Sequence, residues 1–193
     1  ELYHVLGDVF ARQDRHRESV IPLRIASCLE DQEEHYARAA CDALRLLRRE
    51  CEGLVLLGQR VRRHGDRLKG GGPWVTWVEA LEDYGRPDEA IASMRRALEA
   101  RPDDAELHAR AVQFWSRMGH WDLAEQALAR VERDGNQSLF LEAAAHFHLT
   151  AGRWDQAFEL ALRWHHETPD DIGACRLLLH LTARRQGPEA ALA

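Results

Sequence analysis

The sequence predicts an all-α protein, built as an α-solenoid of stacked antiparallel helix pairs. Of its 193 residues, 45% are hydrophobic and 30% are charged, which is the composition of a folded chain rather than of a disordered or collagen-like one. Ala, Leu, Arg and Glu, which favour helices, dominate over the β-branched and aromatic residues that favour strands. A short motif also recurs at a nearly constant interval, which indicates structural repeats.

The recurring motif is centred on a glycine. The string YGRPDEA at residues 84–90 returns as MGHWDLA at 118–124 and as AGRWDQA at 151–157. Its glycines are 34 and then 33 residues apart. The triplet Pro-Asp-Asp occurs at 102–104 and again at 169–171, 67 residues later. Two independent markers therefore indicate the same period.

Each repeat is predicted to contain two helices, with the glycine in the turn between them and Pro-Asp-Asp after the second. Between these marks, apolar residues recur at intervals of three and four, the spacing of one helix face. In residues 71–104 this spacing is kept by Trp74, Trp77, Val78 and Leu81, and then by Ala90, Ile91, Met94, Ala97 and Leu98.

At these residues the sequence resembles the tetratricopeptide repeat family. The family pattern is a Trp, then Leu-Gly, an aromatic residue, a turn Gly, an Ala, an aromatic residue, an Ala and a Pro. Its places are taken here by Trp74, Trp77, Gly85, Ala90, Met94, Ala97 and Pro102. Val78 departs from the pattern, because a Gly or Ala is usual there. The resemblance implies a superhelix of helix pairs that binds proteins or peptides.

Phased from this repeat, the chain divides into two parts. Residues 1–70 hold degenerate repeats, and residues 71–193 hold clearer ones at 71–104, 105–137, 138–171 and a truncated 172–193. In the degenerate part Ser19 and Gly53 take the small-residue place of the second helix, Arg48 takes the turn position and Arg60 stands where an Ala is expected. Pro22 would remove a backbone hydrogen bond or kink a helix if it lay in the interior.

The boundary between the two parts carries the run Lys-Gly-Gly-Gly-Pro at residues 69–73. The balance of charge changes there, from 13 basic and 12 acidic residues through Gly72 to 13 basic and 20 acidic residues after it. The run is either a hinge between two sub-arrays or a loop inserted in one rigid solenoid. We favour the loop, because neighbouring repeats usually bury a continuous core.

Several classes of function are not expected. The formal net charge of −6 disfavours nucleic acid as a partner, and no apolar run approaches the roughly 18–20 residues that span a bilayer. No nucleotide-binding, hydrolase or zinc-site motif occurs, despite 11 His residues, so we expect no enzyme, no cofactor and no metal site. The four cysteines form no CxxC pair and are predicted to be buried free thiols, as in a cytoplasmic protein. The six Trp residues are predicted to pack in the core and between repeats.

In tetratricopeptide arrays the first helix of each pair lines a concave groove, and its inward polar positions usually contact the ligand. The resemblance therefore implies a partner-binding set made of Arg38, Asp42, Glu79, Asp83, Gln113, Arg117, Glu142, His146, Arg176 and His180. His4, Asp8, Arg12 and Arg45 have the same phase. The Lys and Asn clamp of the chaperone-binding members is missing, so a terminal carboxylate is not an expected ligand. The alternative is a solvated helix face with i,i+4 pairs such as Arg38 with Asp42.

One stretch of the chain is locally basic, with eight cations against three carboxylates. The cations are Arg45, Arg48, Arg49, Arg60, Arg62, Arg63, Arg67 and Lys69. The stretch could dock an acidic protein surface or RNA, although it lacks the interleaved aromatic residues that single-stranded nucleic acid stacks on. A solvated helix that carries excess arginine is the favoured interpretation.

The predicted function is a non-catalytic scaffold that binds a partner protein or peptide in the groove of the array. Two alternatives stay open: a regulatory or substrate-presenting arm of a larger enzyme, such as a glycosyltransferase or a sulfotransferase, and a scaffold of an exopolysaccharide export system. Because the chain starts at Glu1, inside a predicted helix, we expect it to be a piece of a longer polypeptide. The partner, the cellular process and the oligomeric state are not predicted.

Overall fold

The structure is a computed structural model that describes residues 1–67 and 69–186, with no account of the side chains of Lys69 and Gln186. Over these residues it contains eleven α-helices, one short 3-10 turn and no strand. Contacts between Cα atoms group the chain into two compact units, residues 1–104 and residues 105–193. The predicted repeat at 172–193 is described only as far as Gln186.

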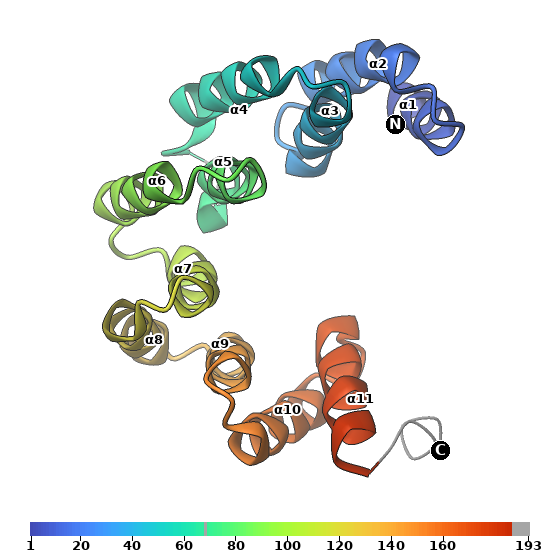
Figure 1. The fold of residues 1–193 in the computed structure, drawn as a ribbon. Coiled ribbons are helices and arrows are strands. Elements are labelled where there is room, and N and C mark those ends of the chain that lie inside the picture. The colour runs from blue at the N-terminus through green and yellow to red at the C-terminus, as the bar shows by residue number, and fades with distance from the viewer. Residues whose placement is uncertain (68, 187–193) are drawn as a thin grey trace. The chain divides into compact units, whose positions relative to one another are not determined.

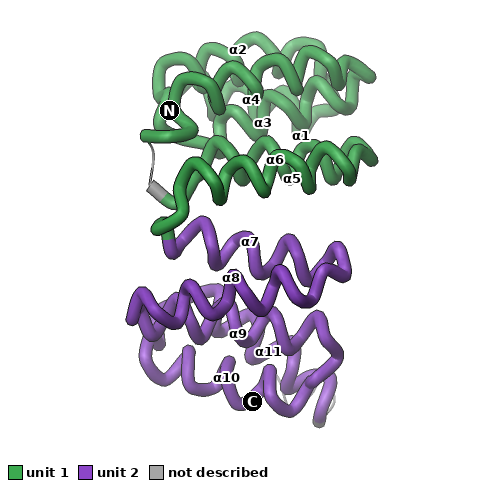
Figure 2. The backbone as a smooth tube through the Cα atoms, turned by 90° about the vertical axis from the view of Figure 1, so that its left-hand side faces the viewer, with its two compact units in different colours: residues 1–104 green, residues 105–193 purple. Residues whose placement is uncertain are grey.

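The first unit, green in Figure 2, holds three helix pairs in which each helix packs against the next along the chain. Helix α3 also packs against α5, the first helix of the following pair, which is the contact that stacks one repeat on another. The elements, labelled in Figure 1, are α1 (Leu2–Arg12), α2 (His16–Leu29), α3 (Glu34–Leu46), α4 (Glu50–His64), η1 (Lys69–Gly71), α5 (Gly72–Asp83) and α6 (Pro87–Ala100).

The second unit, purple in Figure 2, is built in the same way, and α7 packs against α9 as α3 packs against α5. Helices α9, α10 and α11 share one apolar cluster around Ala161 and Trp164. Its helices are α7 (Ala105–Arg117), α8 (Trp121–Asp134), α9 (Gln137–Thr150), α10 (Trp154–Glu167) and α11 (Ile172–Gln186). The predicted fold class, stacked helix pairs without strands over the described residues, is confirmed in each unit.

The turns inside the pairs share one backbone conformation. Gly85, Gly119 and Gly152 have φ of 69°, 75° and 73°, in the left-handed region that glycine adopts without a steric penalty. Asp14 and Arg48 take the same conformation, with φ of 56° and 59°, although side-chain-bearing residues rarely do so. The degenerate repeats therefore keep the turn geometry with residues less suited to it.

Each second helix presents a small residue five positions after this turn residue. Ala90, Ala124 and Ala157 are fully buried there, and so is Ser19. Gly53 takes the place in α4, where a Cβ atom would lie 2.8 Å from the Sγ atom of Cys41 and 2.9 Å from the hydroxyl of Tyr84. The small-residue position is thus where helices approach most closely.

The contacts of Arg60 explain why α4 carries an arginine where an alanine is expected. Its side chain is only 6% exposed, and its guanidinium donates to the carbonyl oxygens of Ser27 (3.2 Å) and Asp31 (2.7 Å) and to Oε1 of Glu34 (2.7 Å). These acceptors lie at the end of α2, in the following loop and at the start of α3. Arg60 therefore satisfies carbonyl groups that a helix end leaves without partners.

The prediction that tryptophans pack in the core is confirmed at Trp115 and Trp164, whereas Trp121 and Trp154 are 39% and 38% exposed. Trp115 and Trp164 are 2% exposed in the core. Trp121 and Trp154 open α8 and α10 and are more exposed, yet each contacts the next helix: Trp121 meets the ring of Phe147 edge-on, and the guanidinium of Arg184 lies 3.8 Å from the ring centre of Trp154.

The cysteines and Pro22 test two of the predictions made from the sequence. Cys41 is buried as predicted, but Cys28 and Cys51 are exposed, so the prediction of buried thiols is wrong for these two. Both lie on faces of α2 and α4 that turn to solvent. Pro22 is buried inside α2, where the helix continues despite the donor that proline lacks.

The glycine run is held by contacts within the first unit. Gly70 and Gly71 are left-handed, with φ of 71° and 61°. The backbone N–H of Gly70 donates to a carboxylate oxygen of Asp104 at 3.1 Å, and Asp104 in turn accepts from Arg101 at 2.6 Å. These contacts favour the interpretation of the run as a loop.

Candidate functional site

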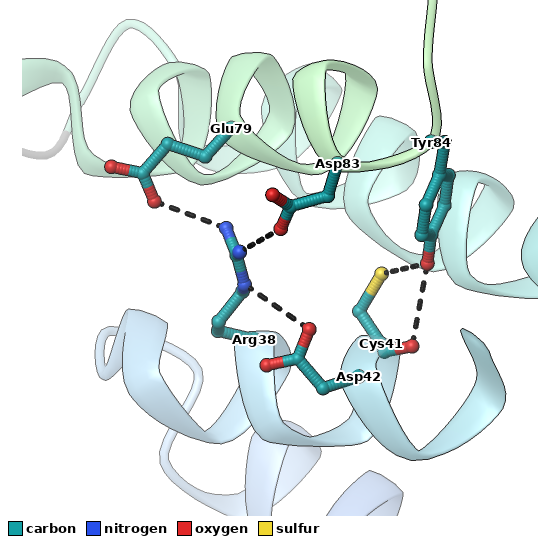
Figure 3. A network of polar contacts seen from close by, with 6 residues as sticks. All are labelled: Arg38, Cys41, Asp42, Glu79, Asp83 and Tyr84. Carbon is teal, nitrogen blue, oxygen red and sulfur yellow. Dashed lines mark hydrogen bonds and ion pairs between the residues drawn. The ribbon is translucent and has the colours of Figure 1, made fainter. Parts of the chain in front are cut away.

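In the first unit, predicted groove residues from two repeats form one polar network. Arg38 and Asp42 lie one turn apart on α3, and Glu79 and Asp83 lie one turn apart on α5. Because α3 packs against α5, the Arg38 guanidinium reaches all three carboxylates: Asp42 at 3.4 Å, Glu79 at 3.0 Å, and Asp83 (Figure 3). The pair of Arg38 with Asp42 is therefore present, but as one part of a larger cluster.

This cluster carries an excess of negative charge. One guanidinium faces three carboxylates, and the side chains of Asp42, Glu79 and Asp83 keep 43%, 48% and 39% of their surface exposed. Each carboxylate oxygen can accept more than one hydrogen bond. The cluster can therefore accept hydrogen bonds from a cationic side chain of another molecule while Arg38 stays in place.

A second contact joins α3 and α5 beside the cluster. The Sγ atom of Cys41 lies 2.8 Å from the hydroxyl oxygen of Tyr84, which is also 3.3 Å from the carbonyl oxygen of Cys41 (Figure 3). Burial raises the pKa of the Cys41 thiol and raises the pKa of the Tyr84 hydroxyl. Both groups thus stay protonated at neutral pH, so this pair joins two helices and is no nucleophile.

At the N-terminal end, His4 of α1 meets an aromatic pair on α3. Its ring centre lies 4.7 Å from that of Tyr36 and 5.3 Å from that of His35. His4 also approaches Asp8 at 3.7 Å, one turn further along α1. His4 and Asp8, which have the same phase as the predicted groove residues, therefore lie close together. These contacts involve no residue of the Arg38 cluster.

The second unit brings together polar groups from three first helices. Gln113 on α7 donates a hydrogen bond to the carboxylate of Glu142 on α9. One turn along α9, the positive charges of Arg117 on α7 and Arg176 on α11 lower the pKa of His146. Five of the six predicted residues in this unit thus interact across neighbouring repeats, and His180 is exposed one turn beyond Arg176.

The environment shifts the protonation of the two central groups. Burial raises the pKa of Glu142, with Asp171 acting in the same direction and Arg110 and the Gln113 hydrogen bond opposing it. Burial also lowers the pKa of His146, with Arg110, Arg176 and Arg117 adding to the effect. His146 is therefore neutral at neutral pH and can both donate and accept a hydrogen bond.

Sequence reasoning missed Arg110 and Asp171, which both act on this group. Arg110 precedes Gln113 by three residues on α7, so the helical period was a sufficient signal for it. Asp171 lies just before α11, where its carboxylate accepts from the backbone N–H groups of Gly173 (2.7 Å) and Ala174 (3.1 Å) as a helix cap. Its side chain belongs to a loop, which a search along first helices does not cover.

Neither a metal-binding cluster nor a membrane-spanning helix is found among residues 1–67 and 69–186. Among them, no group of three or more His, Cys, Asp or Glu side chains is arranged to hold a metal ion. None of their helices has both the length and the apolar character needed to cross a bilayer.

Comparisons with known proteins agree with the helix-pair geometry. The family model described as tetratricopeptide repeat matches residues 81–146, and no curated protein matches the sequence. Among solved structures, a thermophilic TPR protein of Thermus thermophilus is similar with a TM-score of 0.58 and 18% identity, covering 99% of this chain and 98% of that one.

Two other structures share the fold. A tetratricopeptide repeat protein of Parabacteroides merdae is similar with a TM-score of 0.59 and 13% identity, covering 98% of this chain and 75% of that one. PilW, a widely conserved type IV pilus biogenesis factor, is similar with a TM-score of 0.55 and 15% identity, covering 99% and 88%. At these identities the likeness concerns the fold alone.

Proposed function

Because this chain carries tetratricopeptide repeats, which are in general non-catalytic scaffolds for protein interactions, we propose that it binds a partner protein or peptide along the polar faces of its first helices. The observation that carries the proposal is the gathering of predicted groove residues from separate repeats into shared clusters. In the first unit Arg38 joins Glu79 and Asp83, and in the second Gln113 joins Glu142.

Such clusters are suited to recognition because their side chains are already ordered before a partner arrives. Arg38 is held by three carboxylates, and Glu142 by Gln113. A group that is held in its binding conformation loses less entropy on association, which leaves more of the interaction energy for affinity. The side chains of Asp42 and Asp83 in this cluster keep 43% and 39% of their surface exposed to solvent.

The two units favour different chemistry in the bound segment. The Arg38 cluster has an excess of carboxylates, so it suits a lysine or arginine of the partner. In the second unit three arginines, Arg110, Arg117 and Arg176, act on His146, and two carboxylates, Glu142 and Asp171, lie in the same group; this excess of cations suits an acidic side chain. We therefore propose that the first unit binds a cationic side chain and that the second unit binds an acidic one.

The experiment replaces Gln113, Arg117 and Glu142 together by alanine in the full chain. A partner is first captured from an extract of the source cells and identified by mass spectrometry, and its affinity for the purified chain is then measured by calorimetry. We expect the triple variant to lose about tenfold or more in affinity, because each lost charged hydrogen bond weakens binding by about 1.5–3 kcal/mol.

A matched control replaces Arg95 and Arg130, which are exposed on the second helices α6 and α8. These two substitutions should leave the affinity unchanged, and both variants should keep the melting temperature of the parent chain. If replacing Arg95 and Arg130 lowered the affinity and the triple variant did not, the binding face would have to lie on the second helices.

A further inference from the structure

The first unit contains a cleft of about 630 Å³ that lies where the turn after α3 meets the turn after α5. On one side it is lined by Arg45, Leu46, Arg48, Glu50, Cys51 and Leu54, and on the other by Asp83, Tyr84 and Arg86. Only Asp83 also belongs to the Arg38 cluster. The cleft is therefore a distinct surface at the turn edge of the helix pairs, next to the polar face of the first helices.

Three guanidinium groups line this cleft: Arg45 near the end of α3, Arg48 in the turn that follows, and Arg86 in the turn before α6. Arg86 pairs with Glu89 at 2.5 Å. Within residues 1–67 and 69–186, neither Arg45 nor Arg48 makes an ion pair with a carboxylate. Of the two carboxylates in the lining, Asp83 pairs with Arg38, which leaves Arg45 and Arg48 against the single carboxylate of Glu50. The lining therefore keeps an excess of one positive charge.

The structure separates these two arginines from the rest of the basic stretch. Arg49 pairs with Glu52 at 2.5 Å, and Arg60 is buried against Glu34. Arg62 and Arg63 are exposed in the last turn of α4, outside the cleft. The run of cations in the sequence is thus not one patch, and Arg45 and Arg48 are the members of it that line this cleft.

The cleft also offers apolar surface and an accessible thiol. Leu54 is 7% exposed and forms part of the wall, whereas Leu46 is 58% exposed. Cys51, in the first turn of α4, is exposed and lines the same cleft. Small apolar pockets with a few fixed polar groups are the usual form of ligand sites, because the apolar wall supplies affinity and the polar groups set orientation.

We propose that this cleft binds an acidic peptide segment of a partner protein, with carboxylates on Arg45 and Arg48 and one apolar side chain against Leu46 and Leu54. Guanidinium groups match carboxylates because they can donate two parallel hydrogen bonds. A single-stranded nucleic acid fits less well, since Tyr84 is the one aromatic residue in the lining on which a base could stack, whereas Leu46 and Leu54 suit an apolar side chain. The inference goes beyond the proposed function, because it adds a surface at the turn edge that shares Asp83 and the in-phase Arg45 with the predicted groove residues and otherwise consists of other residues.

The test uses Cys51 as a reporter inside the cleft. Cys28 and Cys175 are replaced by serine in the full chain, so that Cys51 is the accessible thiol and Cys41 stays buried. The reaction of Cys51 with a chromogenic disulfide is timed in the presence of octapeptides that contain at least four Glu or Asp and one Leu, Ile or Phe. We expect acidic octapeptides to slow this reaction in a concentration-dependent way that yields a dissociation constant.

Two matched double variants locate the charge that matters. Replacing Arg45 and Arg48 by glutamine should weaken the best peptide about tenfold, as expected for the loss of charged hydrogen bonds. Replacing Arg62 and Arg63 by glutamine removes the same charge from the same region and should leave the dissociation constant unchanged. All four arginines are exposed, so both variants should keep the helical circular dichroism of the parent.

The proposal is overturned if no octapeptide slows the Cys51 reaction, or if both double variants weaken binding equally. Protection by peptides in which lysine replaces the acidic residues would also overturn it. Stronger protection by a single-stranded oligonucleotide would assign the cleft to nucleic acid instead. The triple variant of Gln113, Arg117 and Glu142 should retain the protection, so this test and the test of the proposed function can fail separately.

Discussion

Replacing Gly53 by alanine tests the close approach of α4 to α3 and α5. The added Cβ atom would lie 2.8 Å from the Sγ atom of Cys41 and 2.9 Å from the hydroxyl oxygen of Tyr84. Both distances are shorter than any van der Waals contact of a carbon atom. The substitution must therefore displace the Cys41–Tyr84 contact or push α4 outward.

Two opposing contributions set the size of the effect. Alanine is favoured over glycine inside a helix by about 0.8–1 kcal/mol. Overpacking a close helix contact costs about 1–3 kcal/mol, and the separation of Tyr84 from Cys41 adds the loss of a partly buried hydrogen bond, about 1 kcal/mol. The second contribution is larger, so we expect Gly53→Ala to lower the free energy of unfolding by about 1–3 kcal/mol.

The assay is urea unfolding followed by circular dichroism, in two backgrounds. In the parent chain Gly53→Ala should destabilise. In a chain that carries Cys41→Ala and Tyr84→Phe, both obstructing atoms are gone, and the same substitution should stabilise by up to about 1 kcal/mol, because only the helix preference is left. A Gly53→Ala variant that is equally destabilising in both backgrounds would refute the packing argument.

Three further substitutions test other parts of the fold. Ala124→Leu should destabilise by about 1–3 kcal/mol in urea unfolding, because Ala124 is fully buried; a neutral result would place α8 in a different rotation. Arg60→Ala should lower the free energy of unfolding by about 3 kcal/mol, because it leaves the Glu34 carboxylate without its ion-pair partner. Adding Glu34→Gln should recover part of this loss. The lowered pKa of His146 means that the unfolded chain binds a proton more readily, so stability should fall as pH drops below 6.5. His146→Gln should make the melting temperature less dependent on pH between about 7 and 5, and an unchanged slope would contradict this origin.

Much of the fold could be predicted from the sequence because it depends on local interactions. The turn positions at Gly85, Gly119 and Gly152 follow from a backbone conformation that glycine adopts readily. Arg48 occupies the equivalent place with the same left-handed φ, as the repeat phase predicts. Likewise, the period of 3.6 residues per turn is enough to identify the buried face of each helix.

The candidate site could be predicted only in part. Arg38 and Asp42 lie one helical turn apart, so their proximity follows from the sequence alone. The contacts of Arg38 with Glu79 and Asp83 join residues 41 and 45 positions apart and depend on how α3 lies against α5. The neutral state of His146 depends in addition on burial and on three arginines from two other helices, which no spacing rule contains.

By itself, the sequence determined the all-α class, the two-helix repeat and the residues that form its turns, because these depend on neighbours within one helical turn or one repeat. Only the tertiary structure decided that Arg60 is buried against Glu34, and that Arg45 and Arg48 lie in a cleft with Arg86 while Arg62 and Arg63 lie outside it. The physical reason is that a run of like charges along a helix faces in several directions. Packing between helices then selects which side chains are buried, which are paired, and which are left for a partner.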